Sequence, residues 1–398
     1  MTEKTLIIAA SSFATSNVLG GHYRSAAAIA SLLKNDYKVI LLNVGARPSP
    51  VMAADGVETL FYEGRPEWPG PLRSKIAGMV EARGAHAFLA FDQKAGELVR
   101  PLARQKKLGF VLVKPGGGQP RLYYPKADHN VVFMPADARW LTARNPPRSS
   151  ISLAAGRIYA PEQDRDAQSL LRTEIGLSDD DMAIVRIGRL HEHYSAVNRA
   201  ALALAAKLRA EGLPARMILI GTAQSPNEYR ALNALKGADD AILSDERFTN
   251  QASRLLGMFR YNVGTGRGFM EGAALGQVMF CASQYSDGDL PLLVSDENFQ
   301  NFFDGNFSPR IRPDVSQAEN RDRILEMARH QAIQARLSTA SRHWFEDFFS
   351  AESSKSAYKA EIETATSNPE GVGVDHFKSE VHLRSSVLLD RLRTWIAR

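Results

Sequence analysis

The chain of 398 residues has a single cysteine, Cys281. One thiol cannot form an intramolecular disulfide, and zinc sites built from paired cysteines have no basis here. Cys281 lies within the apolar run VMFCAS, which favours a buried small side chain over a reactive thiol. This scarcity of cysteine fits a reducing compartment, and we expect a cytoplasmic protein.

Long apolar runs are also missing, since none reaches the roughly 18–20 residues that a transmembrane helix requires. The N-terminal stretch MTEKTLIIAASSFA has only a short apolar patch and no clear cleavage site, so we expect a first β-strand rather than a signal peptide. Neither charge dominates, with 49 basic against 44 acidic residues and a net charge of +5. That mild excess suits an anionic substrate or a membrane surface, and we expect no nucleic-acid partner.

Several local signatures of enzyme chemistry are absent. No glycine loop fits G-x-G-x-x-G at the first βα turn or the P-loop pattern, which disfavours dinucleotide oxidoreductases and P-loop NTPases. No G-x-S-x-G elbow, H-E-x-x-H motif or Cys-x-x-Cys pair occurs. His191 and His193 flank Glu192, but side chains at i and i+2 do not share a helix face. We therefore expect no metal site.

What the chain does contain is a regular alternation of apolar strand-like runs and helical segments. Strands are predicted over 6–10, 37–44, 87–91, 109–113, 131–134, 183–187, 216–220, 241–244 and 278–282, and helices over 22–33, 137–142, 196–209, 252–261, 321–336 and 341–350. Such interleaving predicts an α/β fold with parallel sheets covered on both faces. We expect two doubly wound halves, residues 1–158 and 167–340, joined by a charged linker over 159–166.

The remaining residues, 341–398, are predicted to form C-terminal helices. A loop is expected over 366–374 and a last amphipathic helix over 377–396, with Phe377 and Trp395 on its apolar face and basic residues opposite. This helix either packs on the first half or a partner subunit, or lies on an anionic membrane surface. The second alternative would make the protein peripheral on the inner face of the membrane.

The richest local pattern is the run VGTGRGFMEGAALG at Val263–Gly276. Its glycines allow close backbone approach, and the N-terminus of the helix that follows offers N–H groups and partial positive charge to a phosphate. Glu271, near the start of that helix, can accept hydrogen bonds from hydroxyl groups. Hydroxyls beside phosphates indicate a nucleotide sugar.

Other loops lie at comparable positions, at the ends of predicted strands. Gly20-Gly21 follows the first strand, KPGGG occupies 114–118, and Gly188-Arg189-Leu190 opens the second half. Ligands bind at the carboxyl ends of parallel strands, so we expect loops of both halves to face one cleft. The planar cation of Arg189 suits a diphosphate, although a surface ion pair is the plainer alternative. Weaker candidates for an acceptor or sugar contact are His22, Lys114, Gly116 and Gly117.

The diglycine, the G-R-L triplet and the loop leading to Glu271 together resemble the GT-B glycosyltransferases of the retaining, family 4-like kind. The resemblance covers residues 4–350 and is strongest over 183–285. It implies two Rossmann-like domains, a donor held mainly by the second, and a C-terminal helix that crosses back onto the first. It also implies metal-independent transfer from a UDP- or GDP-sugar to a hydroxyl of a glycan, glycolipid or other glycoconjugate, with retention.

Carried over by position, Glu271 matches the second glutamate of the E-x7-E motif, which binds the ribose, and Arg189 matches the arginine that neutralises the diphosphate. These two are the candidate catalytic residues. The donor-binding set is Gly20, Gly21, Arg189, Gly264, Thr265, Gly266, Arg267 and Glu271.

Two positions depart from the family pattern. Val263 replaces the first glutamate, and Tyr194 replaces a lysine; Arg267, His191 or His193 are candidates to compensate. A non-catalytic nucleotide- or glycan-binding scaffold and a nucleotide-sugar epimerase stay open as alternatives.

Overall fold

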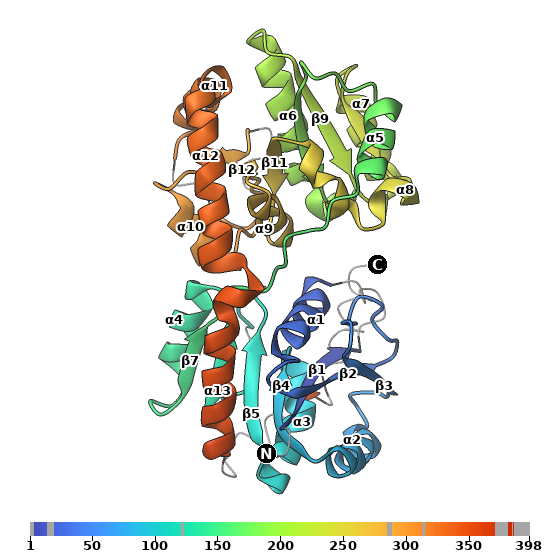
Figure 1. The fold of residues 1–398 in the computed structure, drawn as a ribbon, viewed down its shortest axis with the longest axis vertical. Coiled ribbons are helices and arrows are strands. Elements are labelled where there is room, and N and C mark those ends of the chain that lie inside the picture. The colour runs from blue at the N-terminus through green and yellow to red at the C-terminus, as the bar shows by residue number, and fades with distance from the viewer. Residues whose placement is uncertain are drawn as a thin grey trace. The chain divides into compact units, whose positions relative to one another are not determined.

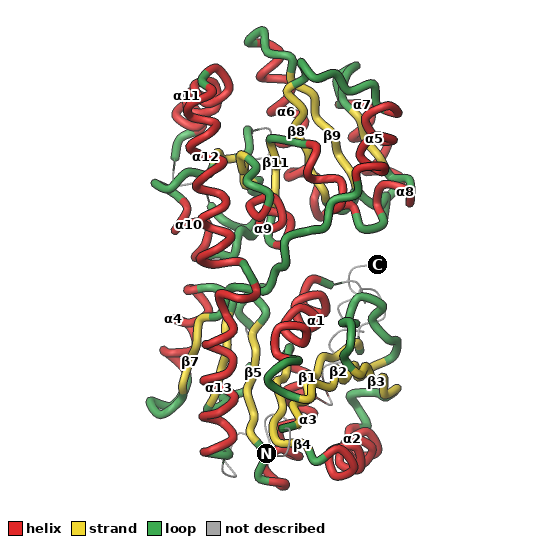
Figure 2. The backbone as a smooth tube through the Cα atoms, in the orientation of Figure 1, coloured by secondary structure: helices red, strands yellow, loops and turns green. Residues whose placement is uncertain are grey.

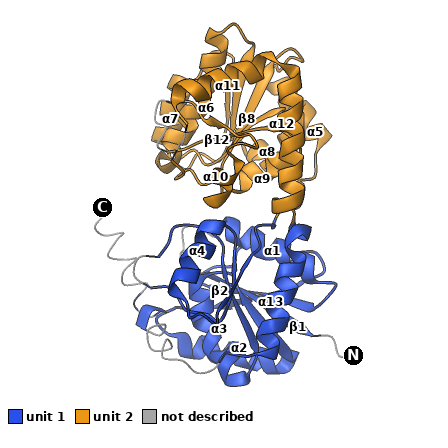
Figure 3. Cartoon of the chain, turned by 90° about the vertical axis from the view of Figure 1, so that its left-hand side faces the viewer, with its two compact units in different colours: residues 1–157, 351–398 blue, residues 158–350 orange. Residues whose placement is uncertain are grey.

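The computed structural model describes residues 4–13, 20–120, 123–284, 289–312, 315–370, 381–383 and 385. The chain divides into two compact units, one formed by residues 1–157 and 351–398 and the other by residues 158–350 (Figure 3). Each unit has its own sheet of mainly parallel strands with helices packed against it (Figures 1 and 2). The predicted α/β class with two doubly wound sheets is therefore confirmed.

The first unit is built on a parallel sheet in the order β3-β2-β1-β4-β5-β6-β7. Its strands are β1 (Thr5–Ser12), β2 (Lys38–Gly45), β3 (Glu58–Glu63), β4 (Ala85–Ala90), β5 (Gly109–Lys114), β6 (His129–Val132) and β7 (Ser150–Leu153). Its helices are α1 (Gly21–Leu33), α2 (Pro69–Arg83), α3 (Gln93–Lys106), α4 (Pro135–Arg144) and α13 (Lys355–Ser367). Every residue of β5 is buried, and so is every residue of β1 except Ser11, because helices cover both faces of the sheet.

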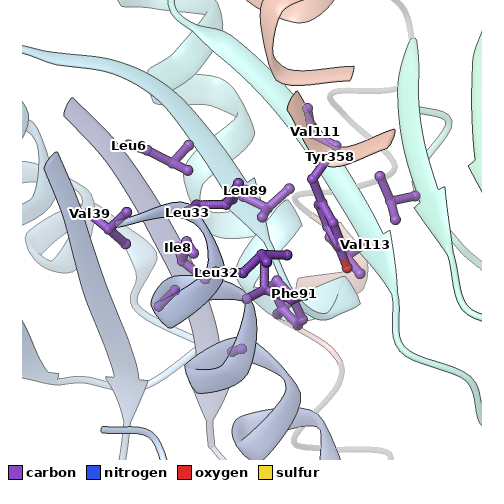
Figure 4. Close-up of a cluster of buried hydrophobic side chains, with 14 of the residues drawn as sticks. Leu6, Ile8, Leu32, Leu33, Val39, Leu89, Phe91, Val111, Val113 and Tyr358 are labelled. Atoms are coloured by element: carbon purple, nitrogen blue, oxygen red, sulfur yellow. The ribbon is translucent and has the colours of Figure 1, made fainter. Parts of the chain in front are cut away.

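Alternate residues of β1 enter two different cores, as the period of a strand requires. Leu6 and Ile8 join the cluster covered by α1 and α13, whereas Ile7 and Ala9 face α2, α3 and α4. Figure 4 shows the first cluster, in which Tyr358 of α13 lies among the side chains of β4 and β5. Residues that follow the second unit in sequence thus complete the core of the first.

The second unit has the strand order β10-β9-β8-β11-β12-β13, with only the β12–β13 pair antiparallel. Its strands are β8 (Met182–Ile187), β9 (Ala215–Ile220), β10 (Ala241–Leu243), β11 (Tyr261–Gly264), β12 (Val278–Cys281) and β13 (Leu292–Leu293). Its α-helices are α5 (Arg165–Glu174), α6 (Ser195–Ala210), α7 (Pro226–Leu235), α8 (Glu246–Thr249), α9 (Arg267–Ala274), α10 (Phe299–Asp304), α11 (Gln317–Arg329) and α12 (Gln331–Trp344).

Side-chain caps fix where several of these helices begin. Asp92, Asp164, Ser225 and Ser316 each accept a hydrogen bond from a backbone N–H in the first turn of α3, α5, α7 and α11. Such caps satisfy donors that the helix itself leaves unpaired. The cap at Asp164 also ends the expected linker, because α5 already begins at Arg165.

Three predicted segments need correction. Residues 252–261 are not one helix: a 3-10 segment, Ala252–Met258, ends at the extended Phe259, and Tyr261 enters the sheet. The helix expected over 321–336 is two helices, because His330 is extended (φ −122°, ψ 105°) and separates α11 from α12. The loop expected from residue 366 begins later, since α13 continues to Ser367.

The expected amphipathic helix over 377–396 lies outside the described residues, apart from 381–383 and 385. Within the described part of the chain, no helix has the length and apolar character needed to cross a bilayer.

Candidate functional site

The glycine-rich run forms a strand–turn–helix in the second unit (Figure 1). Gly266 has φ +50° and ψ −122°, a conformation that suits glycine, and it directly precedes α9. At Gly264, a Cβ would lie 2.6 Å from the Cα of Phe269, so only glycine lets the helix pack this closely on its strand. Thr265 and Gly266 remain half-buried, which leaves the turn accessible to a ligand.

Val263 has no access to this turn through its side chain. It is completely buried in the core of the second unit and pairs with Phe280 of β12. Its backbone carbonyl, in contrast, accepts a hydrogen bond from Arg186 of β8. The position where the resemblance implies a glutamate therefore contributes a carbonyl oxygen and no charge.

The structure brings Arg267 and Glu271 together on α9. Nε of Arg267 donates to Oε1 of Glu271 at 2.7 Å, and both side chains keep some exposure to solvent. Nη1 of Arg267 is buried with no hydrogen-bond partner in the described part of the chain. One carboxylate and one unused guanidinium donor thus lie beside the glycine turn.

Gly188 and Arg189 lie next to this turn, because β8 pairs with β11 in the sheet. A Cβ on Gly268 would lie 3.9 Å from the carbonyl oxygen of Ile187, the last residue of β8. The guanidinium carbon of Arg189 lies 5.9 Å from the ring centroid of Tyr194, within cation–π range. The G-R-L triplet and the glycine-rich run therefore lie side by side, at the carboxyl ends of the adjacent strands β8 and β11.

The histidines after Arg189 form a short 3-10 turn, Glu192–Tyr194. Nδ1 of His191 accepts a hydrogen bond from the backbone N–H of His193, and the carboxylate of Glu192 accepts one from the hydroxyl of Ser225. Over the residues that the structure describes, no three histidine, cysteine or acidic side chains gather as a metal site would need.

The sequence did not predict a role for one charged residue of this region. Arg186, inside the apolar strand run MAIVRI, is only 2% exposed. Its Nε donates to Oδ1 of Asn198 at 2.8 Å, and Asn198 in turn donates through Nδ2 to the carbonyl of Arg189 at 3.2 Å. Burial lowers the pKa of Arg186 to about 10, so the guanidinium is still protonated at neutral pH.

The remaining candidates belong to the first unit. Gly20 precedes α1 as its cap and Gly21 is its first residue, while the ring of His22 lies 3.8 Å from that of Tyr23. Burial lowers the pKa of His22, and the Asp92 carboxylate partly offsets this effect. His22 is therefore a neutral imidazole at the carboxyl edge of the first sheet.

Lys114 is buried and its amino group is engaged inside the fold. Nζ lies 3.0 Å from Oδ2 of Asp137 and donates to the carbonyl of Gly116 at 3.2 Å. Gly116 and Gly117 adopt φ +87° and +84°, which makes them turn glycines of the loop that Lys114 holds. In this structure Lys114 supports its own loop, and its contact with a ligand stays a prediction.

Comparison with known proteins gives a likeness in fold only. No model of a known protein family matches the chain, and no curated protein matches its sequence. A glycosyltransferase from Rickettsia africae has a TM-score of 0.65 at 12% identity, covering 92% of this chain and 100% of that one. Anabaena Alr3699/HepE in complex with UDP and glucose has a TM-score of 0.61 at 11% identity, covering 91% and 100%.

A third similar structure is the pneumococcal O-GlcNAc transferase GtfA in complex with UDP and GlcNAc, with a TM-score of 0.57 at 7% identity. It covers 92% of this chain and 99% of that chain. At such identities the likeness establishes the fold, which is that of the GT-B glycosyltransferases, as the sequence predicts.

Proposed function

We propose that this chain is a glycosyltransferase that transfers a sugar from a UDP-sugar to a hydroxyl acceptor, with the donor held by the second unit. The observation that carries the proposal is that two adjacent parallel strands end at the same carboxyl edge of one sheet, β8 leading to Arg189 and β11 leading to the glycine turn and Glu271. Ligands of open α/β sheets bind at that edge. Fold neighbours that carry UDP with glucose or with GlcNAc support UDP as the nucleotide.

The diphosphate lies, in this proposal, between Arg189 and the N-terminus of α9. Transfer breaks the bond between the anomeric carbon and the β-phosphate oxygen, so negative charge accumulates on the departing diphosphate. A fixed guanidinium and the positive end of a helix stabilise such charge without rearranging. These groups make a metal ion unnecessary, and we expect UDP affinity to be unchanged by EDTA.

Glu271 accepts the hydrogen bonds of the ribose hydroxyls, and Arg267 links this carboxylate to the diphosphate. Nε of Arg267 already donates to Glu271, while Nη1 has no partner among the described residues and offers a donor to a phosphate oxygen. Arg267 thereby provides a polar contact to the donor in place of the glutamate and the lysine that Val263 and Tyr194 replace. Retention of configuration is proposed on the resemblance of this loop alone. The glycan or glycolipid acceptor is assigned to the first unit, near His22.

The test is calorimetric titration with UDP, GDP and 2′-deoxy-UDP, followed by assays with UDP-sugars. We expect UDP to bind, and 2′-deoxy-UDP to bind about tenfold more weakly, since a hydrogen bond to a carboxylate contributes about 1.5–3 kcal/mol. Glu271→Gln keeps an acceptor oxygen but loses the charge, so it should reduce the difference in affinity between UDP and 2′-deoxy-UDP and lose turnover. Absence of UDP and GDP binding overturns the proposal.

Two outcomes favour the alternatives. Binding without transfer or sugar-nucleotide hydrolysis in any acceptor mixture indicates a non-catalytic binding protein. Release of free UDP together with an epimerised sugar, in the absence of an acceptor, indicates an epimerase.

A further inference from the structure

Arg186 occupies a position where a charge is costly. It lies in β8, a central strand of the second sheet whose neighbouring residues Val185 and Ile184 are completely buried. Strands covered on both faces are normally apolar throughout, and arginine is almost never fully buried unless it is paired. A guanidinium with 2% exposure at this point needs a physical reason.

The partners of Arg186 are neutral. Nε donates to the amide oxygen of Asn198 at 2.8 Å, and Nη1 donates to the carbonyl of Val263 at 3.1 Å. Among the described residues, no carboxylate lies within ion-pair distance of this guanidinium. Hydrogen bonds satisfy its donors in part, but the charge itself is uncompensated in a medium of low dielectric, which destabilises the ligand-free fold.

The position of Arg186 relates this charge to the donor site. A Cβ on Gly188 would lie 3.1 Å from Nη2, so the guanidinium lies directly beneath the backbone that precedes Arg189. The Val263 carbonyl that it holds directly precedes the glycine turn, and Asn198 also holds the carbonyl of Arg189 at 3.2 Å. The guanidinium of Arg186 is thus connected by hydrogen bonds to both loops of the site, directly to the carbonyl of Val263 and through Asn198 to the carbonyl of Arg189.

We propose that Arg186 is a positioning residue of the donor site, whose uncompensated positive charge is neutralised when the diphosphate binds. It acts through the backbone of Arg189 and of the 263–268 turn, and through its field, which is weakly screened because water is excluded around it. This inference rests on the proposed function. It predicts that Arg186 lowers the stability of the free protein and raises its affinity for diphosphate.

The test compares Arg186→Met with the wild type by thermal unfolding and by titration with UDP and uridine. Methionine fills similar space without charge. We expect the ligand-free melting temperature to stay equal or rise, UDP affinity to fall at least about tenfold, and uridine affinity to stay within about twofold. Arg186→Lys, which keeps the charge, should keep most of the UDP affinity.

Arg209→Met is the matched control. Arg209 lies in the same unit and is ion-paired with the buried Asp240 at 2.7 Å. Its loss should lower the melting temperature and leave the ratio of UDP to uridine affinity unchanged, the opposite of the result at Arg186.

A purely structural Arg186 would give a lower melting temperature in Arg186→Met and equal losses for UDP and uridine, and this result overturns the inference. Unchanged UDP affinity overturns it too, as does failure of both Arg186→Met and Arg186→Gln to fold. If the wild type binds no nucleotide, it is the proposed function that fails, whereas the melting temperatures still test whether the buried charge is uncompensated.

Discussion

Arg267 stands at an unfavourable place for helix stability. It is the first residue of α9, where the helix dipole favours an anion, and the helix has no acidic residue in its first turn. The pair with Glu271 also runs with the cation on the N-terminal side, the weaker of the two orders for an i,i+4 pair. A cation at the N-terminus of α9 does not stabilise the helix, but it would bind an anion such as a phosphate.

Replacing Arg267 with glutamine tests this interpretation. We expect the unfolding free energy to change by less than about 0.5 kcal/mol, since the pair is partly exposed and opposes the dipole. UDP affinity should fall about tenfold, because the unused guanidinium donor and the positive charge are both lost. Chemical denaturation and calorimetric titration measure the two quantities, with Arg199→Gln on exposed surface of α6 as control. A large loss of stability with normal UDP binding would assign the pair to folding.

Of the candidate site residues, Glu271, Arg189 and the glycines could be proposed from the sequence because their side-chain chemistry and spacing are local. Arg186 could not, since a single arginine in the apolar run MAIVRI reads as a strand with one exposed position. Its importance depends on Asn198 and Val263, which only the folded sheet brings beside it.

At the scale of elements, α13 is attached to the edge of the first sheet by a polar cluster. Glu361 accepts hydrogen bonds from His129 at 3.0 Å and from the hydroxyls of Ser150 and Ser152. Burial works against both charges, but the hydrogen bonds outweigh it, so the pKa of Glu361 lies below its usual 4.5 and that of His129 above its usual 6.5. Both groups are therefore charged together over a defined pH range.

The pH dependence of stability follows from these directions. The contribution of Glu361 is complete above pH 4.5 and is lost as pH falls through its lowered pKa. The contribution of His129 is complete below pH 6.5 and is lost as pH rises through its raised pKa. We expect Glu361→Gln to destabilise the protein most between pH 4.5 and 6.5, with a smaller difference on either side, as measured by denaturant unfolding across pH.

Glu363→Gln, an exposed position on the same helix, is the control and should show little pH-dependent difference. A wild-type advantage over Glu361→Gln that grows steadily above pH 8 would contradict the assignment to His129.

The strands β3 and β7 were not predicted from the sequence. Residues 341–398 were expected to form C-terminal helices, but the bounds of α13 were not predicted. In α13 the apolar anchors are few, namely Tyr358, Ile362 and Ala365, among alanine, serine, threonine and glutamate. The strands β3 and β7 are edge strands with half-exposed residues, so their hydrogen bonds to a neighbour define them more than an apolar pattern does. The central strands were found because full burial gives continuous apolar runs.

At the scale of the whole molecule, the second unit is an insertion in the first, because residues 158–350 form it while the residues before and after belong to the first unit. Glu370 anchors the C-terminal segment to the first unit. Its carboxylate is 1% exposed and lies 2.6 Å from Nε of Arg100 and 3.3 Å from Nη2 of Arg104. The alternation of strands and helices in the sequence predicted two sheets, and the family resemblance implied a C-terminal helix that crosses back onto the first domain. The structure identifies residues 351–370 as the segment that packs there.

Tyr358→Ala tests whether the two units are separate in stability. Tyr358 is completely buried against β4 and β5, so its truncation should destabilise the first unit by about 3–5 kcal/mol. Calorimetry should show a transition at lower temperature for that unit. UDP affinity at 25 °C should be unchanged because the proposed donor site lies in the second unit. Loss of UDP binding at temperatures where the first unit is folded would show that the site depends on this core.

The most direct measurement is a crystal structure of the protein with UDP bound. We expect the ribose hydroxyls to donate to Glu271 and the phosphates to lie between Arg189 and the N-terminus of α9, with Nη1 of Arg267 on a phosphate oxygen. UDP bound away from the 263–271 turn, or with its ribose out of reach of Glu271, would contradict the assignment of the donor site.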